Sequence, residues 1–139
     1  MKLFVTGGAG FIGSNYVRHV LAGSDDSVTV FDALTYAGNR ANLHDVAGEP
    51  RYRFVHGDIC DRGAVVEAMA GHDAVVHFAA ESHVDRSILG PDVFVRTNCT
   101  GTNVVCDVAR QVEVGAMVHI STDEVYGSIE VGSFGEGDP

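Results

Sequence analysis

The chain has 139 residues, 45% hydrophobic and 20% charged, a composition typical of one globular domain and not of disordered or fibrous proteins. Nine Lys and Arg against 19 Asp and Glu give a formal net charge of −10, which disfavours non-specific binding to nucleic acid or anionic lipid. No apolar run is long enough to cross a membrane, and the N-terminal run is too short for a signal peptide. The three cysteines lack paired spacing, so we expect a cytoplasmic protein without a disulfide framework.

Short apolar runs alternate with longer amphipathic segments along the chain. Predicted strands are Lys2–Thr6, Val28–Asp32, Tyr52–His56, Ala74–Phe78 and Met117–Ser121, and predicted helices are Phe11–Ala22, Arg62–Ala70 and Pro91–Val112. Asp61 is placed to cap the second helix and Pro91 to begin the third. Ala33–Pro50 is expected to be mostly loop with one helical turn near Asn42, and the last ten residues are also expected to be loop. Strand–helix alternation implies parallel strands joined by right-handed crossovers, so the predicted fold is α/β, a Rossmann-type doubly wound parallel sheet with helices on both faces.

The glycine-rich turn Thr6–Gly13 (TGGAGFIG) lies between the first predicted strand and the first predicted helix. A diphosphate needs close approach to the main chain and gains from the free N–H groups of a helix N-terminus, and Gly7 and Gly10 leave room for it. Gly13 lets the helix pack tightly on the strand. Glycine-rich turns also form ordinary tight corners, but the strand before this turn and the helix after it favour a dinucleotide site.

Acidic residues follow the second and third predicted strands. The Asp32 carboxylate can accept hydrogen bonds from both hydroxyls of an adenosine ribose and would repel a 2′-phosphate, so the sequence predicts NAD rather than NADP. The alternative for Asp32 is a loop cap. Asp58 can accept a hydrogen bond from the adenine amino group, or it can cap the helix that follows.

Polar residues also gather after the fourth and fifth predicted strands. The segment Phe78–Ser87 (FAAESHVDRS) lies at the carboxyl end of a central strand, where open α/β sheets bind ligands; the alternative is a solvated loop. At the turn after the fifth strand, Asp123 and Glu124 can reach one cleft, where mutual repulsion would leave one carboxyl group as a neutral acid and the other as a base. The alternative is a helix N-terminus at which acidic residues are favourable.

The histidines and cysteines show no spacing typical of a metal site, so no metal is expected. His77 and His119 fall within predicted core strands. Cys99 and Cys106 share one face of a predicted helix and are expected to be small buried apolar groups.

Taken together, these segments resemble the extended short-chain dehydrogenase/reductases and, within them, the dTDP-glucose 4,6-dehydratases. The similar segments are TGGAGFIGSN, DALTYAGN, RFVHGDI, HFAAESHVDRSI, TNCTGT and HISTDEVYGS, in the family's order and over essentially the whole chain. By this resemblance, AAESHVDRS and STDEVYG are specific to the dTDP-glucose dehydratase group. Related epimerases and decarboxylases carry other residues in place of Thr122, Asp123 and Glu124, and GDP-mannose dehydratases carry a Ser-Glu pair.

The resemblance implies conversion of dTDP-glucose to dTDP-4-keto-6-deoxyglucose. Hydride passes from C4 of the hexose to NAD, water leaves across C5–C6, and hydride returns to C6. By the same resemblance, Glu124 removes the C5 proton, Asp123 protonates the departing hydroxyl, Thr122 binds the sugar, and Ser82 lies near it. The cofactor contacts expected from the motifs and the resemblance together are Gly7, Gly10, Phe11, Ile12, Gly13, Asp32, Ala33, Leu34, Thr35, Asp58, Ile59, Phe78, Ala79, Ala80, Ser82 and Thr97.

The sequence departs from the family in one respect: residues 1–139 contain no Tyr-x-x-x-Lys pair, in which the family's tyrosine is the base for the 4-hydroxyl. We therefore expect an N-terminal NAD-binding Rossmann domain that lacks its remaining strands and the sugar-nucleotide domain, and that is inactive alone. Two alternatives stay open, an NAD-dependent nucleotide-sugar epimerase and a non-catalytic NAD-binding module. The resemblance also implies a homodimer that pairs through helices including the one that begins near Pro91.

Overall fold

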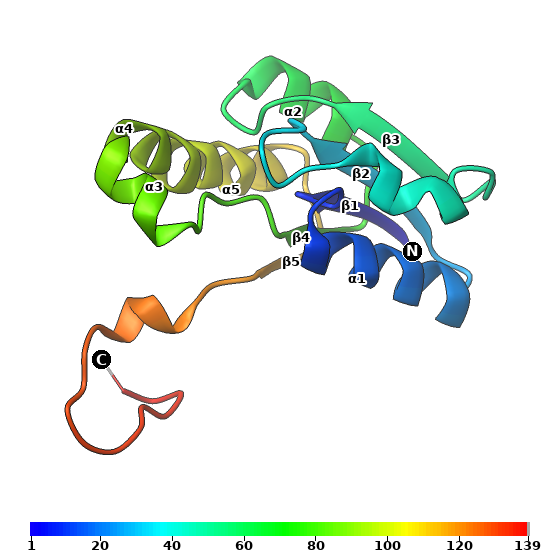
Figure 1. The fold of residues 1–139 in the computed structure, drawn as a ribbon. Helices are drawn as coiled ribbons and strands as arrows, with labels where there is room; N and C mark the ends of the chain where they lie inside the picture. The colour runs from blue at the N-terminus through cyan, green and yellow to red at the C-terminus, as the bar shows by residue number, and fades with distance from the viewer. Residues whose placement is uncertain (139) are drawn as a thin grey trace.

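A computed structural model describes residues 1–138, apart from the side chain of Val84. Its centre is a five-stranded parallel sheet in the order β3-β2-β1-β4-β5 (Figure 1). The strands are β1 (Lys2–Thr6), β2 (Ser27–Asp32), β3 (Tyr52–His56), β4 (Ala74–His77) and β5 (Ala116–His119). All five predicted strands are confirmed, although β4 and β5 end earlier than predicted. From β1 the chain adds β2 and β3 on one side of the sheet, and then β4 and β5 on the other side. Sheets of this class bind ligands at the point between β1 and β4 where the direction changes.

Helices cover both faces of the sheet. On one face lie α1 (Phe11–Gly23) and the 3₁₀ helix η1 (Arg40–Val46), and on the other lie α2 (Arg62–Met69) and α5 (Thr102–Gln111) (Figure 1). Because alternate strand residues point to opposite faces, each face has its own core. The first core includes Leu3, Val5, Val17, Val28, Val30 and Leu43, and the second includes Phe4, Phe31, Val65, Met69, Val75, Val105 and Val108. The predicted doubly wound α/β fold is therefore confirmed.

The helical region between β4 and β5 is more divided than the sequence predicts. A short helix, α3 (Val84–Leu89), overlaps the end of the polar segment Phe78–Ser87, where no helix was predicted. The single helix predicted from Pro91 is α4 (Pro91–Phe94), a π-helical stretch η2 (Val95–Gly101) and then α5. Such π-helical stretches are rare and occur frequently at functional sites. Hydrophobic periodicity misses this one because it widens a turn without interrupting the helix.

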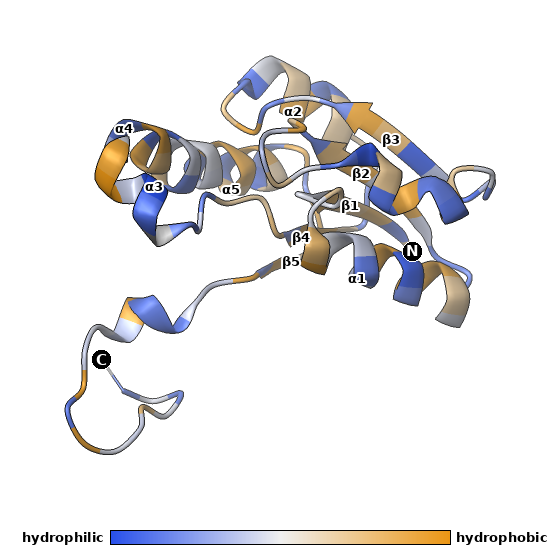
Figure 2. Ribbon diagram, in the orientation of Figure 1, coloured by the Kyte–Doolittle hydropathy of each residue, from blue (hydrophilic) through white to orange (hydrophobic). Residues whose placement is uncertain are grey.

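Two expectations about burial are wrong. Cys99 and Cys106 are exposed rather than buried, because η2 and α5 turn Gly101, Val105 and Val108 toward the sheet instead. His119 is also exposed, since β5 is the edge strand and carries less cover than β4. Figure 2 shows further apolar colour at the α3–α4 end of the helices.

The segment after β5 leaves the sheet. It forms a short 3₁₀ helix, η3 (Asp123–Tyr126), and then an irregular loop that extends away from the other elements (Figure 1). The rings of Tyr126 and Phe134 stack with centroids 5.3 Å apart, so the segment has an internal contact of its own. The prediction of loop for the last ten residues is confirmed as far as residue 138. No helix in the described part of the chain is long and apolar enough to span a membrane.

Candidate dinucleotide-binding site

The glycine turn after β1 has no room for side chains. Gly7 has a φ of 69°, and a Cβ there would lie 2.6 Å from the main-chain nitrogen of Ala79. At Gly13, one turn into α1, a Cβ would lie 2.4 Å from the Gly7 carbonyl oxygen. A Cβ at Gly10 would meet nothing closer than 3.3 Å. Gly7 and Gly13 are thus needed for packing of the turn, while Gly10 is less tightly enclosed and lines the pocket, where a ligand can approach the main chain.

Asp32, at the end of β2, is held against this turn. It is only 7% exposed. Its Oδ2 accepts a hydrogen bond from the Ala9 N–H at 2.9 Å, and its Oδ1 accepts one from the Leu34 N–H at 2.8 Å. A carboxylate can accept about four hydrogen bonds, so each oxygen keeps capacity for a ligand hydroxyl. The carboxylate is fixed in place by main-chain donors and lines the adjoining pocket.

A pocket of about 750 Å³, counted out to its open mouth, lies along the carboxyl ends of β1 to β4. Predicted residues that line it are Gly7, Gly10, Asp32, Ala33, Thr35, Asp58, Ile59, Phe78, Ala79, Ala80 and Thr97. Predicted residues outside the lining are Phe11, Ile12, Gly13, Leu34 and Ser82; of these, Phe11 and Ile12 are highly exposed on the first turn of α1. Lining residues absent from the predicted set are Phe31, Ala37, Gly38, Gly57, Val93 and Arg96, and Glu81 lies within the Phe78–Ser87 segment predicted to bind a ligand.

The residues that the sequence analysis missed differ in whether the sequence could have indicated them. Gly38 belongs to the DALTYAGN segment, and a Cβ there would lie 2.6 Å from Oδ1 of Asp32, so its glycine could have been assigned to the pocket. Val93 and Arg96 gave no local signal. They reach the pocket because α4 and η2 pack beside the end of β3, which is a tertiary contact.

An ion pair lies at the β3 end of the pocket. An Nη of Arg96 is 2.7 Å from Oδ2 of Asp58, and the Cys60 N–H donates to Oδ1 of Asp58 at 2.8 Å. Partial burial would raise the pKa of Asp58, but the Cys60 N–H and the Arg96 guanidinium outweigh it and leave that pKa below its ordinary value. Asp58 does not cap α2, since Asp61 does so by accepting from the Ala64 N–H.

The β4 end of the pocket contains a buried carboxylate. Glu81 is 7% exposed, and its Oε2 has no hydrogen-bond partner among the described residues. Its main-chain N–H and carbonyl both bond to the Asn98 side-chain amide at 2.8 Å, which ties the segment after β4 to η2. A buried acceptor without a partner is costly, and this oxygen lies within the protein rather than at the pocket surface.

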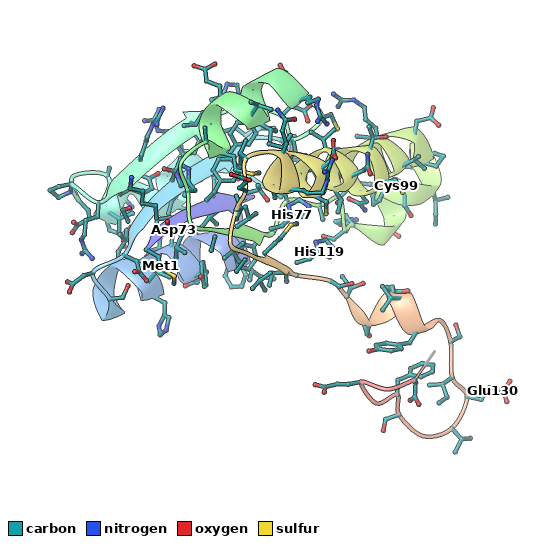
Figure 3. The ribbon with its side chains drawn as sticks, turned by 180° about the vertical axis from the view of Figure 1, so that it is seen from behind. Met1, Asp73, His77, Cys99, His119 and Glu130 are labelled. Atoms are coloured by element: carbon teal, nitrogen blue, oxygen red, sulfur yellow. The ribbon has the colours of Figure 1, made fainter. Side chains whose placement is uncertain are left out.

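Beneath the pocket, a histidine joins three elements. His77 is fully buried, and its ring nitrogens lie 2.5 Å from Oγ1 of Thr6 in β1 and 3.1 Å from Oγ1 of Thr102 in α5. Its ring stacks on His119 with centroids 5.1 Å apart, and Figure 3 shows the two side by side. Burial, with a smaller effect from His119, lowers the pKa of His77 to about 4. His77 is therefore a neutral structural residue at pH 7. Among the described residues, no cluster of His, Cys, Asp and Glu could hold a metal.

A further contact joins the loop after β2 to α3. The Arg86 guanidinium of α3 lies 4.0 Å from the ring centroid of Tyr36 in the loop after β2. This cation–π contact joins the loop that carries Ala37 and Gly38 to the segment that follows Glu81.

The residues predicted to act on substrate lie elsewhere. Thr122, Asp123 and Glu124 are exposed at the start of η3, and none of them lines the pocket. Ser82, predicted near the sugar, is also exposed. Among residues 1–138, the fold thus brings together most of the predicted cofactor contacts but not the predicted reaction groups.

The sheet order and the pocket at the reversal point define a nucleotide-cofactor-binding protein of the doubly wound α/β class. Comparison with known proteins gives a narrower assignment. Residues 4–139 match the family model described as GDP-mannose 4,6 dehydratase, and the chain belongs to this family.

Individual relatives agree with this assignment. The chain is 56% identical to a dTDP-glucose 4,6-dehydratase of Streptomyces niveus over 144 residues, covering 100% of the chain and 43% of the relative. A dTDP-glucose 4,6-dehydratase of Streptomyces venezuelae, solved with NAD bound, superimposes with a TM-score of 0.96 at 58% identity, covering 100% of this chain and 45% of that one. The UDP-Glc/GlcNAc 4-epimerase of Campylobacter jejuni gives 0.91 at 29% identity, covering 99% and 42%. The chain spans less than half the length of these relatives.

Proposed function

We propose that this chain is the NAD-binding part of a dTDP-glucose 4,6-dehydratase, a hydro-lyase. The observation that carries the proposal is the buried Asp32 carboxylate, bonded to the Ala9 N–H of the glycine turn and facing the same pocket. A fixed carboxylate there favours the two free ribose hydroxyls of NAD and repels the 2′-phosphate of NADP.

The lining residues fit the parts of this cofactor in order along the sheet edge. The main chain around Gly7 and Gly10 would receive the pyrophosphate, and Asp32, one strand over, would accept from the adenosine ribose. The next strand end, with Asp58 and Ile59, would receive the adenine. In the other direction, the β4 end with Phe78, Ala79 and Ala80 would meet the nicotinamide half. When bound, NAD would supply a hydride acceptor that can return the hydride later in the same turnover.

The reaction groups are assigned by similarity to the dehydratases. Glu124 would accept the proton from C5 of the hexose after C4 has become a ketone, and Asp123 would give its proton to the oxygen that leaves C6 as water. Thr122 would orient the sugar through its hydroxyl.

A dehydratase is favoured over an epimerase. The two activities share the fold, as the epimerase TM-score of 0.91 shows, but the identity to that epimerase is 29% whereas the identity to the dehydratases is 56% and 58%. The Thr122–Glu124 sequence, which the dehydratase resemblance requires, is present.

The test is an assay of the full-length protein that contains residues 1–139. With dTDP-glucose and NAD, we expect the 4-keto-6-deoxy product, detected by mass spectrometry as the loss of one water. An epimerised hexose with unchanged mass would instead establish the epimerase. Binding of NAD without turnover of any nucleotide-hexose would establish the non-catalytic module.

The cofactor assignment has its own test. Asp32→Ala should weaken NAD binding about tenfold or more and reduce the preference for NAD over NADP, because a charged hydrogen-bond acceptor is lost. Asp25→Ala is the control, since Asp25 is an exposed carboxylate outside the pocket. Equal affinity of the unaltered protein for NAD and NADP would contradict the role of Asp32.

We also propose a cytoplasmic homodimer. Ile88 and Leu89 of α3 and Val95 of η2 are 76%, 88% and 60% exposed, an apolar patch that pairing would cover. The exposed unpaired thiols of Cys99 and Cys106 suit a reducing compartment. Light scattering should give a dimer for the unaltered protein and a monomer for Leu89→Asp.

A further inference from the structure

We infer that Arg96 is a positioning residue that makes the β3 end of the pocket selective for a base carrying an exocyclic amino group. The inference rests on the proposed function, because it takes the cofactor to lie with its adenine at this end. It goes beyond that function in assigning a role to Arg96 and in predicting which bases the pocket rejects.

The position of the base follows from the strand order. Asp32 ends β2, and the neighbouring strand outward from the glycine turn is β3. Neighbouring strands are about 4.8 Å apart, so a base attached to a ribose at Asp32 reaches the residues that follow β3. The lining there is Gly57, Asp58 and Ile59, faced by Val93 and Arg96. Gly57, Ile59 and Val93 offer apolar contact to a flat ring, and Asp58 is the acceptor at its edge.

Asp58 is held on both oxygens. Arg96 bonds to Oδ2 at 2.7 Å, and the Cys60 N–H bonds to Oδ1 at 2.8 Å. The Cys60 thiol, whose pKa is raised by burial so that it stays protonated, donates to the Arg96 carbonyl at 3.2 Å. Cys60 therefore contacts both members of the ion pair, and the carboxylate has one preferred orientation between the loop after β3 and η2.

The chemistry of an oriented, ionised carboxylate decides which base fits. Such a group only accepts hydrogen bonds. It favours the 6-amino group of adenine, which donates, and it opposes the 6-oxo group of hypoxanthine, which accepts. Without Arg96 the carboxylate would lose one of its two fixed partners, could rotate away from the base, and would discriminate less.

The ion pair is poorly suited to a purely structural role. The Arg96 and Asp58 side chains are 58% and 38% exposed, and exposed ion pairs contribute little to stability. Arg62 and Asp107 form a comparable pair at 2.6 Å, with 48% and 37% exposure, between α2 and α5 and outside the pocket. Arg62 thus provides a matched control for the loss of a surface guanidinium.

The experiment compares binding of NAD and of nicotinamide hypoxanthine dinucleotide, in which a 6-oxo group replaces the 6-amino group. Dissociation constants of both are measured by calorimetry on the full-length protein and its variants. We expect the unaltered protein to bind NAD about tenfold or more tightly than the hypoxanthine dinucleotide, because one hydrogen bond to a charged group changes affinity by about that factor. Arg96→Met should reduce this ratio about threefold or more, while Arg62→Met should leave it unchanged.

Asp58→Asn provides a second test of the preference between the two dinucleotides, because it replaces an acceptor with a group that can also donate. Its amide N–H can donate to the 6-oxo group, so the ratio should fall toward one or reverse. If Arg96→Met weakens the binding of both dinucleotides equally, the ratio of their dissociation constants stays constant. Arg96 would then act through charge or folding rather than on the base. That result overturns the inference but not the proposed NAD-binding function. If the unaltered protein binds neither dinucleotide, the proposed function fails, and this inference fails with it.

Discussion

The pocket along β1 to β4 and the segment after β5 differ in how their functional residues are held. Asp32 is buried and bonded to two main-chain N–H groups, and Gly7 is packed against Ala79. By contrast, Asp123 and Glu124 lie exposed on a 3₁₀ helix of four residues that leaves the sheet. The proposed cofactor contacts are thus preorganised by the sheet itself, because strand ends of a parallel sheet meet at one edge. The proposed reaction groups lack comparable contacts among residues 1–138.

His77 connects the two regions. It bonds to Thr6 below the glycine turn and stacks on His119, close to the residues that lead into η3. Figure 3 shows His119 at the point where the chain leaves the sheet, with Glu130 far out on the extended segment. Three experiments test this division between a rigid pocket and a weakly held segment, and a fourth examines a helix cap outside both.

The largest effect is expected on turnover. Asp123→Asn and Glu124→Gln should each lower the rate of product formation by the full-length protein about 10²–10⁴-fold, the contribution of a general acid or base. The NAD dissociation constant should be unchanged, because neither residue lines the pocket. If both variants still form the 4-keto-6-deoxy product at the normal rate, the acid and base assignment is wrong.

The next effect concerns pH. His77 has a folded-state pKa of about 4 against an ordinary value of 6.5, so the unfolded chain binds a proton over that range and the folded chain does not. The stability that this neutral histidine supports is complete above pH 6.5 and is lost as the pH falls toward 4, on the order of 3 kcal/mol. Urea unfolding at several pH values measures this loss.

A matched substitution checks that the pH effect belongs to His77. His77→Gln should flatten the pH dependence between 6.5 and 4, whereas His19→Gln, at an exposed position of α1, should leave it unaltered. An unaltered slope in the first variant would show that His77 is not the group responsible.

A smaller effect on stability is expected from adding a side chain at the glycine turn after β1. Gly13→Ala places a Cβ 2.4 Å from the Gly7 carbonyl oxygen, and we expect a loss of about 2 kcal/mol in the free energy of unfolding together with weaker NAD binding. Gly23→Ala, at the other end of α1, meets nothing within 4 Å and should change stability by less than about 1 kcal/mol. Equal effects of the two would contradict close packing at the turn.

The smallest effect lies outside both regions. Asp61→Ala removes the side chain that caps α2 through the Ala64 N–H at 3.1 Å and should cost about 1 kcal/mol in thermal unfolding. Glu67→Ala removes an exposed carboxylate from the same helix and should be close to neutral. A drop in NAD affinity for Asp61→Ala would show that the pocket depends on α2 more than its lining suggests.

The sequence predicted most of the pocket because its residues follow strand ends. Each strand is a short apolar run, and in a parallel sheet their carboxyl ends meet at one edge, so Gly7, Asp32, Asp58 and Ala79 could be grouped before any coordinates were known. The cap at Asp61 was equally local. These features depend on neighbours in the chain, which is the information that a single sequence contains.

Contacts between distant elements were not predictable in this way. Arg96 reaches Asp58 because the π-helical stretch packs on the loop after β3, and Glu81, whose main chain bonds to Asn98, has a buried Oε2 without a hydrogen-bond partner among the described residues. Cys99 is exposed because its helix turns a different face to the sheet. The sequence by itself determined the doubly wound parallel sheet, the glycine turn after β1 and the acidic residues at the ends of β2 and β3, since hydrophobic periodicity and backbone sterics act locally. Only the tertiary structure decided which side chains share a cavity, because that depends on how helices far apart in the chain pack on one sheet.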